Sequence, residues 1–257
     1  MSAVGQAATT ARYTLIEYGR NRFAILLAAT FIPGWTTTIY LDTHTTPVSF
    51  LLRADDVSVV VAGNRLMQLT GALNAVVLII GFLTFAATFA SHAFDHRLAL
   101  AGYSRFRLVL GKLASLSLAC ALAAAYATAS LCVFIAPARP VWVAGALFAG
   151  AMTYGAMGVV LGTVLRREVT GMFAVVMISL VDVSLQTPVA SAIADSPLMI
   201  LLPSYGAVQA ATTAAFTTRS AVPAVAVQCL WFTAAAVVAL AAFHRLTRVA
   251  HARTPRT

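Results

Sequence analysis

Residues 66–91 of this chain read LMQLTGALNAVVLIIGFLTFAATFAS, and the run contains no charged side chain. A helix of this length crosses the hydrocarbon core of a bilayer, which is about 30 Å thick. Five further apolar runs lie on either side of it, over residues 23–41, 113–135, 141–165, 169–187 and 222–243. We therefore expect six membrane-spanning helices, which together form a single membrane domain over residues 23–244.

The composition supports this expectation. Of the 257 residues, 60% are hydrophobic and 10% are charged, whereas soluble domains contain about 25% charged residues. A water-soluble domain of this size cannot bury so large a share of apolar side chains. The net charge of +9 comes from basic residues in short clusters between the apolar runs, which is typical of membrane-protein loops rather than of a nucleic-acid surface. The composition predicts an all-α integral membrane protein.

The basic residues are divided unequally between the two sets of loops. Thirteen lie in residues 1–22, 92–112, 166–168 and 245–257, and four lie on the other side, at Arg53, Arg65, Arg139 and Arg219. Loops rich in Arg and Lys remain in the cytoplasm. We therefore expect both termini there, with an interfacial helix within residues 1–22 and a basic tail at 245–257. Residues 42–65 and 188–220 are expected outside.

Residues 188–220 are moderately apolar but contain no uninterrupted span. Pro188, Pro197, Pro203 and Gly206 break the segment. We expect short outer or re-entrant helices here, whose backbone groups must be satisfied by protein or water.

Two of the predicted spans carry polar side chains along one face. Thr70, Asn74 and Thr84 recur at helical spacing in the second span, and Ser179, Asp182 and Gln186 do so in the fifth. Such a face in lipid must meet another helix or water. It could line a translocation pathway, or it could serve helix packing, with Asp182 bonded to a neighbouring helix. In the fourth span, Gly158 and Gly162 form a GxxxG pattern that permits close helix packing.

Motifs for chemistry on this chain are absent from the sequence. The phosphate-binding pattern G-x-x-x-x-G-K-[ST] does not occur, nor do G-x-S-x-G or H-E-x-x-H. Cys120, Cys132 and Cys229 lie inside apolar runs without metal-ligand spacing, so neither a disulfide nor a metal site is predicted. We expect a chain that is not itself an enzyme.

The loop after the second span reads Gly102-Tyr-Ser104-Arg105-Phe-Arg-Leu-Val-Leu-Gly111-Lys112. It resembles the membrane subunit of type-2 ABC exporters of the drug- and antibiotic-efflux branch. In that family a Pro-x-Ser-Arg pattern, a few apolar residues and then Gly-Lys open the third helix. Gly102 stands where the family has proline. The family has several acidic residues before this position, whereas this chain has Asp95. The resemblance extends along nearly the whole chain, because the family also has an N-terminal interfacial helix, six spans and two short outer helices before the sixth.

The resemblance implies a permease subunit in a bacterial plasma membrane that exports a hydrophobic or amphiphilic compound, such as a drug, an antibiotic or a lipid-like molecule. Two membrane subunits, identical or different, would pair with two soluble ATPase subunits that bind ATP and magnesium. The implied docking loop for the ATPase comprises Asp95, Arg97, Leu98, Tyr103, Ser104, Arg105, Arg107 and Lys112.

Two alternatives remain open at this point. A self-contained secondary transporter or channel would also have this composition, although the chain shows no internal repeats or rows of intramembrane charges. A six-helix intramembrane enzyme would need a nucleophile and a base on facing helices, and the sequence does not single out such a pair.

Overall fold

The computed structural model describes residues 16, 19, 22–100, 105–165 and 167–251. In chain order these form α2 (Arg22–Asp42), β1 (Pro47–Leu52), β2 (Val57–Ala62), α3 (Gly63–Leu100), α4 (Arg105–Cys132), α5 (Pro140–Val164), α6 (Glu168–Leu185), the 3-10 helix η1 (Pro197–Leu201), α7 (Tyr205–Phe216) and α8 (Val222–His251). The predicted interfacial helix within residues 1–22 lies almost entirely outside the described residues.

The helices confirm the predicted fold class, an all-α membrane protein. Within the described part of the chain, five helical segments are long and apolar enough to cross a membrane: Gly63–Ala90, Gly111–Cys132, Pro140–Val164, Glu168–Leu185 and Val222–Ala242. Each of these overlaps a span that the hydropathy pattern predicts. The first predicted span coincides with α2, a helix of 21 residues.

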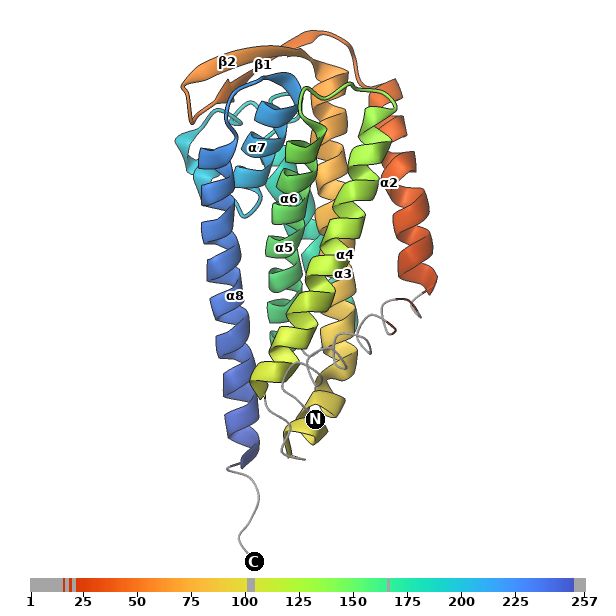
Figure 1. Ribbon diagram of the computed structural model, residues 1–257, viewed down its shortest axis with the longest axis vertical. Helices are drawn as coiled ribbons and strands as arrows, with labels where there is room; N and C mark the ends of the chain where they lie inside the picture. Colours follow the sequence, from red (N-terminus) through yellow and green to blue (C-terminus); the bar gives the residue numbers. More distant parts are fainter. Residues whose placement is uncertain (1–15, 17–18, 20–21, 101–104, 166, 252–257) are drawn as a thin grey trace, which may run out of the picture.

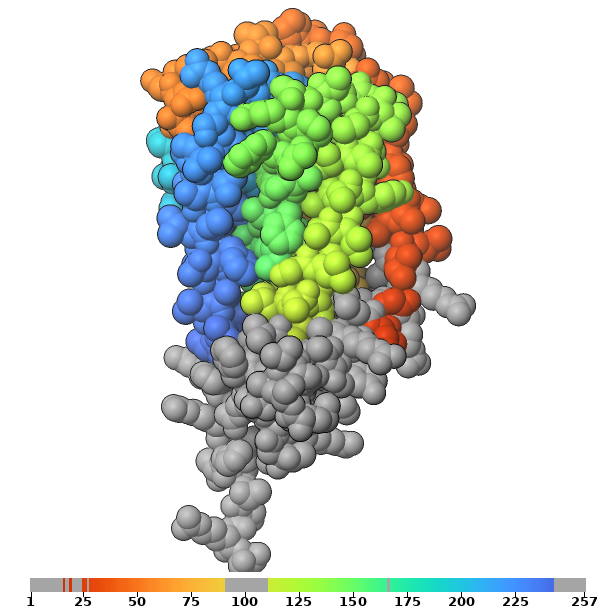
Figure 2. Space-filling view, viewed as in Figure 1, coloured from red at the N-terminus to blue at the C-terminus, as the bar shows by residue number. Residues whose placement is uncertain are grey.

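The long helices form one elongated bundle (Figure 1), in which α3 and α5 share the most extensive contact. The β-hairpin lies across one end of the bundle, beside α7 and the turn between α4 and α5, and we call this the hairpin end. The described start of α2 and the end of α8 both lie toward the opposite end. In the space-filling view (Figure 2), α8, α5 and α4 run side by side along one face, and the hairpin covers the bundle above them.

Two features differ from what the sequence suggests. The charged loop expected over residues 92–112 is mostly helical, because α3 continues to Leu100 and α4 begins at Arg105. Residues 92–100 contain neither Gly nor Pro, so the helix has no local signal to end at the membrane surface.

The other feature is the antiparallel hairpin, which pairs Pro47 with Ala62 and Leu52 with Val57. Its second strand is rich in valine, a residue that favours strands.

A proline in α2 is compensated by a side chain from α4. Pro33 lies inside α2 and has no N–H to donate to the carbonyl of Ala29, four residues earlier. The hydroxyl of Tyr126 on α4 donates to that carbonyl at 2.9 Å. An unpaired carbonyl is costly in lipid, so this bond both satisfies α2 and joins it to α4.

The GxxxG pattern brings α5 and α3 into backbone contact. A Cβ placed on Gly158 would lie 2.5 Å from the carbonyl oxygen of Gly81 and would also clash with the Thr84 hydroxyl. A Cβ on Gly162 would lie 3.0 Å from the carbonyl oxygen of Phe85. The absence of side chains at these positions therefore sets the distance between the two central helices.

This close contact predicts different effects for two alanine substitutions in the same helix. Gly158→Ala should lower the free energy of unfolding by about 1–3 kcal/mol, because the backbone of α3 must shift. Gly145→Ala is the matched control, since a Cβ there would meet nothing within 4 Å. Unfolding of both variants in mixed micelles tests the prediction, and equal stabilities would contradict it.

The bond between Tyr126 and α2 predicts a coupled pair of substitutions. Tyr126→Phe should lower the free energy of unfolding by about 1 kcal/mol, because the Ala29 carbonyl loses its donor. In a Pro33→Ala background the helix regains its own N–H, so there the same substitution should cost less than about 0.5 kcal/mol. A double-mutant cycle measures the coupling. Equal costs in both backgrounds would mean that Tyr126 does not compensate for Pro33.

Candidate functional site

A cluster of polar side chains lies inside the bundle, where the chain turns from η1 into α7. The centre of the cluster is Asp182 of α6, which is 2% exposed. Its Oδ2 accepts a hydrogen bond from the Tyr154 hydroxyl at 2.5 Å and another from the Ser204 backbone N–H at 3.0 Å. Its Oδ1 accepts from Nε2 of Gln186 at 2.7 Å. Three elements thus direct donors at one carboxyl group.

The Asp182 side chain lies at the N-terminus of α7. Ser204 is the N-cap residue of α7, so the backbone N–H that Asp182 accepts belongs to the N-terminus of that helix. A helix N-terminus has unpaired N–H groups and a partial positive charge, both of which attract a carboxylate. Gln186 adds a bond to the Ser204 hydroxyl at 2.9 Å. The cluster therefore fixes the start of a buried helix.

A second amide holds the same turn from α8. Nε2 of Gln228 donates to the Thr153 hydroxyl at 2.7 Å and to the carbonyl of Pro203 at 2.9 Å, and its Oε1 accepts from the N–H of Ala207 at 2.9 Å. Gly206 lies directly against α8, because a Cβ there would be 2.5 Å from the backbone nitrogen of Gln228. The start of α7 is thus held by α5, α6 and α8 together.

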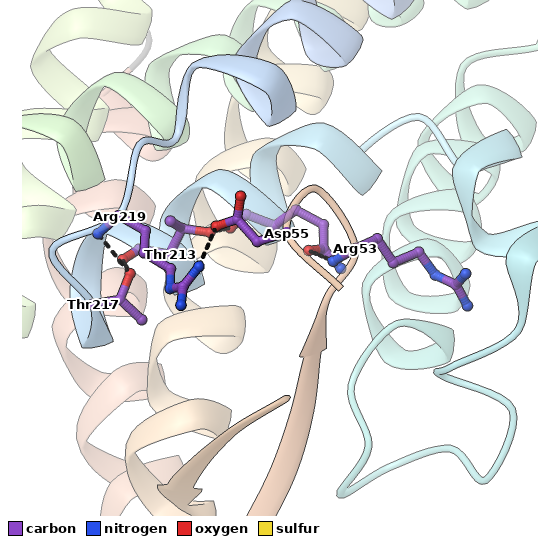
Figure 3. A network of polar contacts seen from close by, with 6 residues as sticks. Arg53, Asp55, Thr213, Thr217 and Arg219 are labelled. Atoms are coloured by element: carbon purple, nitrogen blue, oxygen red, sulfur yellow. Dashed lines mark hydrogen bonds and ion pairs between the residues drawn. The ribbon is translucent and has the colours of Figure 1, made fainter. Parts of the chain in front are cut away.

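At the hairpin end, a further network joins α7 to the hairpin (Figure 3). Gln209 of α7 accepts from the backbone N–H of Arg53 at 3.3 Å and donates to the carbonyl of Leu51 at 3.1 Å. Arg219, after α7, forms an ion pair with Asp55 at 3.3 Å. Both partners of this ion pair are partly exposed, so its contribution to stability is small. The two bonds of Gln209 are the firmer attachment.

The structure places the six pathway candidates at helix contacts within the chain. Asp182 and Gln186 belong to the cluster described above. The Asn74 side chain donates to the backbone carbonyl of Ser179 at 3.0 Å, which joins α3 to α6. The hydroxyls of Thr70, Thr84 and Ser179 donate to carbonyls of their own helices at 3.1, 2.9 and 3.0 Å. All six side chains are buried, and each has a hydrogen-bond partner.

The predicted docking loop lies at the end of the bundle away from the hairpin. Asp95, Arg97 and Leu98 fall in the last turns of α3, and Arg105 and Arg107 fall in the first turn of α4. Tyr103 and Ser104 lie outside the described residues, as do the side chains of the five residues just named. Lys112 is one turn farther along α4. The described ones among these residues therefore lie near the ends of two long helices, on either side of residues 101–104.

Tyr154, Ser204 and Gln228 are members of the cluster that sequence reasoning did not find. They come from three different elements, and no local spacing relates them to Asp182. Among the described residues, no group of three or more His, Cys, Asp or Glu side chains could hold a metal ion. Cys120, Cys132 and Cys229 are free thiols.

Comparison with known proteins does not assign the chain to a family. It matches no protein-family model, and no curated protein sequence matches it significantly.

The cluster around Asp182 predicts a large effect on stability. Asp182→Leu should lower the free energy of unfolding by about 3 kcal/mol or more, because the Tyr154 hydroxyl and the Ser204 N–H both lose their acceptor. Asp182→Asn keeps one acceptor oxygen and should cost less. Ser179→Ala is the control on the same helix face, and should cost under about 1 kcal/mol, because the Ser179 hydroxyl bonds only to its own helix. Unfolding in mixed micelles distinguishes the three, and a fully stable Asp182→Leu variant would contradict the prediction.

Proposed function

We propose that this chain is the membrane-spanning permease subunit of an ATP-driven ABC exporter, with ATP hydrolysis on a separate chain. The observation that carries the proposal is the stretch from Ser104-Arg105 to Gly111-Lys112, which resembles the corresponding stretch of type-2 exporters. Its position supports the proposal, because α4 begins at Arg105, at the connection between two long helices and away from the hairpin end.

The elements before the last span also support this function. The resemblance implies two short outer helices there, and η1 and α7 occupy that place in the chain. The helix α7 is buried and is held in place by buried polar side chains, whose burial costs free energy. A simple membrane anchor does not need such a helix. It suits a permease, in which the outer part of the bundle must keep its shape while helices around it move.

The proposed orientation places the α3–α4 connection and both termini in the cytoplasm of a bacterial cell, where a soluble ATPase can reach them. The hairpin end then faces outward. The charge distribution supports this, since Arg53, Arg65, Arg139 and Arg219 lie at the hairpin end, while the remaining basic residues gather in the other set of loops. A second membrane subunit completes the proposed transporter.

The proposed cargo is a hydrophobic or amphiphilic compound. Two of the pathway candidates, Asp182 and Gln186, hold the start of α7. In the proposed exporter they keep the orientation of that helix constant during a transport cycle. Thr70, Asn74, Thr84 and Ser179 lie on helix faces between α3 and its neighbours. In the proposed cycle they become pathway residues where those helices separate.

The test is co-purification with a soluble ATPase encoded by the adjacent reading frame. The unaltered chain should retain the ATPase in detergent and stimulate its hydrolysis. The double variant Arg105→Glu/Arg107→Glu should lose both, because a groove that accepts basic side chains repels acidic ones. Arg253→Glu/Arg256→Glu is the matched control, with the same change in charge on the tail, and it should retain the ATPase.

Two results would contradict the proposal. One is an unaltered chain that transports its cargo under an ion gradient without any ATPase, which would favour a secondary transporter. The other is unchanged co-purification and transport by the Arg105→Glu/Arg107→Glu variant. Insertion of each variant into the membrane is checked by fractionation, so that a loss of binding is not confused with a loss of folding.

A further inference from the structure

Two buried polar side chains of α3 have polar atoms without a partner among the described residues. Gln68 is 0% exposed, and neither its Oε1 nor its Nε2 makes a hydrogen bond. Asn64, one helical turn earlier, is 6% exposed, and its Oδ1 is likewise unpaired. Buried polar groups in native proteins are nearly always hydrogen-bonded. Gln68 differs from the pathway candidates, since each of those makes at least one side-chain hydrogen bond, although Oε1 of Gln186 is also unpaired.

Both residues lie on the side of α3 that faces α2. Residues three and four positions apart share one helix face, so Asn64, Gln68 and Gly71 lie in a row. A Cβ on Gly71 would clash with the Ile39 side chain and lie 3.6 Å from Nε1 of Trp35, and both residues belong to α2. We call this row of Asn64, Gln68 and Gly71, together with Trp35 and Ile39 opposite Gly71, the α2–α3 seam.

The seam begins at the hairpin end of the bundle. Asn64 is the second residue of α3, directly after the second strand of the hairpin. Gln68 lies about 6 Å farther along the helix axis, at a rise of about 1.5 Å per residue. The unpaired atoms are thus within a short distance of the aqueous end of the bundle, although the side chains themselves are covered.

Thr36, next to Trp35 in α2, has its own hydrogen-bond partners. The Thr36 hydroxyl, which is fully buried, lies 2.9 Å from the carbonyl oxygen of Ile32 and 3.1 Å from that of Pro33, both in its own helix. The contact between α2 and α4 at this end is aromatic, with the Tyr40 and Phe134 rings 5.1 Å apart. The Thr36 hydroxyl is therefore satisfied within α2, and Gln68 makes no hydrogen bond to Nε1 of Trp35, the indole donor of the seam.

We propose that the α2–α3 seam is a water-binding site that fills from the hairpin end, and that Asn64 and Gln68 are the side chains that hold the water. The three unpaired atoms are two amide oxygens and one amide nitrogen. Water donates to the first two and accepts from the third, and a buried water typically makes about three hydrogen bonds. The three atoms are covered, so in this proposal water reaches them when α2 moves away from α3.

Cysteine labelling tests the seam without any ATPase, and so separately from the proposed function. The three native cysteines are replaced by alanine, and single cysteines are introduced by Gln68→Cys and, as control, Leu66→Cys. Leu66 is 0% exposed, lies closer to the hairpin end and points to the opposite side of α3. In lipid nanodiscs, a charged water-soluble thiol reagent should modify Gln68→Cys about tenfold faster than Leu66→Cys, a ratio that corresponds to about 1.4 kcal/mol.

A second pair of variants asks whether Gln68 itself holds the water. Asn64→Cys should be labelled readily, and adding Gln68→Leu should slow its labelling about tenfold, because an apolar seam of the same volume stays closed. The inference is wrong if Gln68→Cys reacts no faster than Leu66→Cys, or if Gln68→Leu leaves the labelling of Asn64→Cys unchanged. Monodisperse elution of each variant establishes that the bundle is folded.

Discussion

The structure depends on one constraint, which is that a backbone N–H or C=O inside the hydrocarbon core must find its partner within the protein. A continuous helix satisfies the constraint on its own, and α3 to α6 do so along most of their length. At two places among the described residues, a side chain from another helix supplies a missing backbone partner. Pro33 frees the carbonyl of Ala29, and Tyr126 of α4 bonds to it. The turn before α7 exposes backbone groups inside the bundle, and Asp182 and Gln228 bond to them.

Several of the buried hydrogen bonds described above converge on α7. Asp182 and Gln228 hold its start from α6 and α8, and Gln209 ties its middle to the hairpin. These bonds join α6, α8 and the hairpin to α7 at this end of the bundle. The α2–α3 seam contrasts with this arrangement, because both polar atoms of the Gln68 side chain are buried there without a partner.

The fold could be predicted from the sequence because hydropathy is a local property, whereas the site could be predicted only in part. The span over residues 141–165 and α5 differ by a single residue at each end, and the breakers Pro197, Pro203 and Gly206 indicate the short helices between α6 and α8. Asp182 and Gln186 could be recognised as a pair, because they are one turn apart on one helix. Tyr154, Ser204 and Gln228 could not, because only the packing of α5, α7 and α8 brings them together. The hairpin could not be predicted, because its two strands are only six residues long and lie within a polar segment.

The attachment of α7 to α8 also bears on the order in which a ribosome delivers the chain. Gln228 reaches back to the carbonyl of Pro203 and the N–H of Ala207, so those two groups have no such partner until the last span has been synthesised and inserted. Before that point, water at the membrane surface is the remaining partner for the two groups. The final packing of α7 into the bundle therefore depends on the insertion of α8, the last helix.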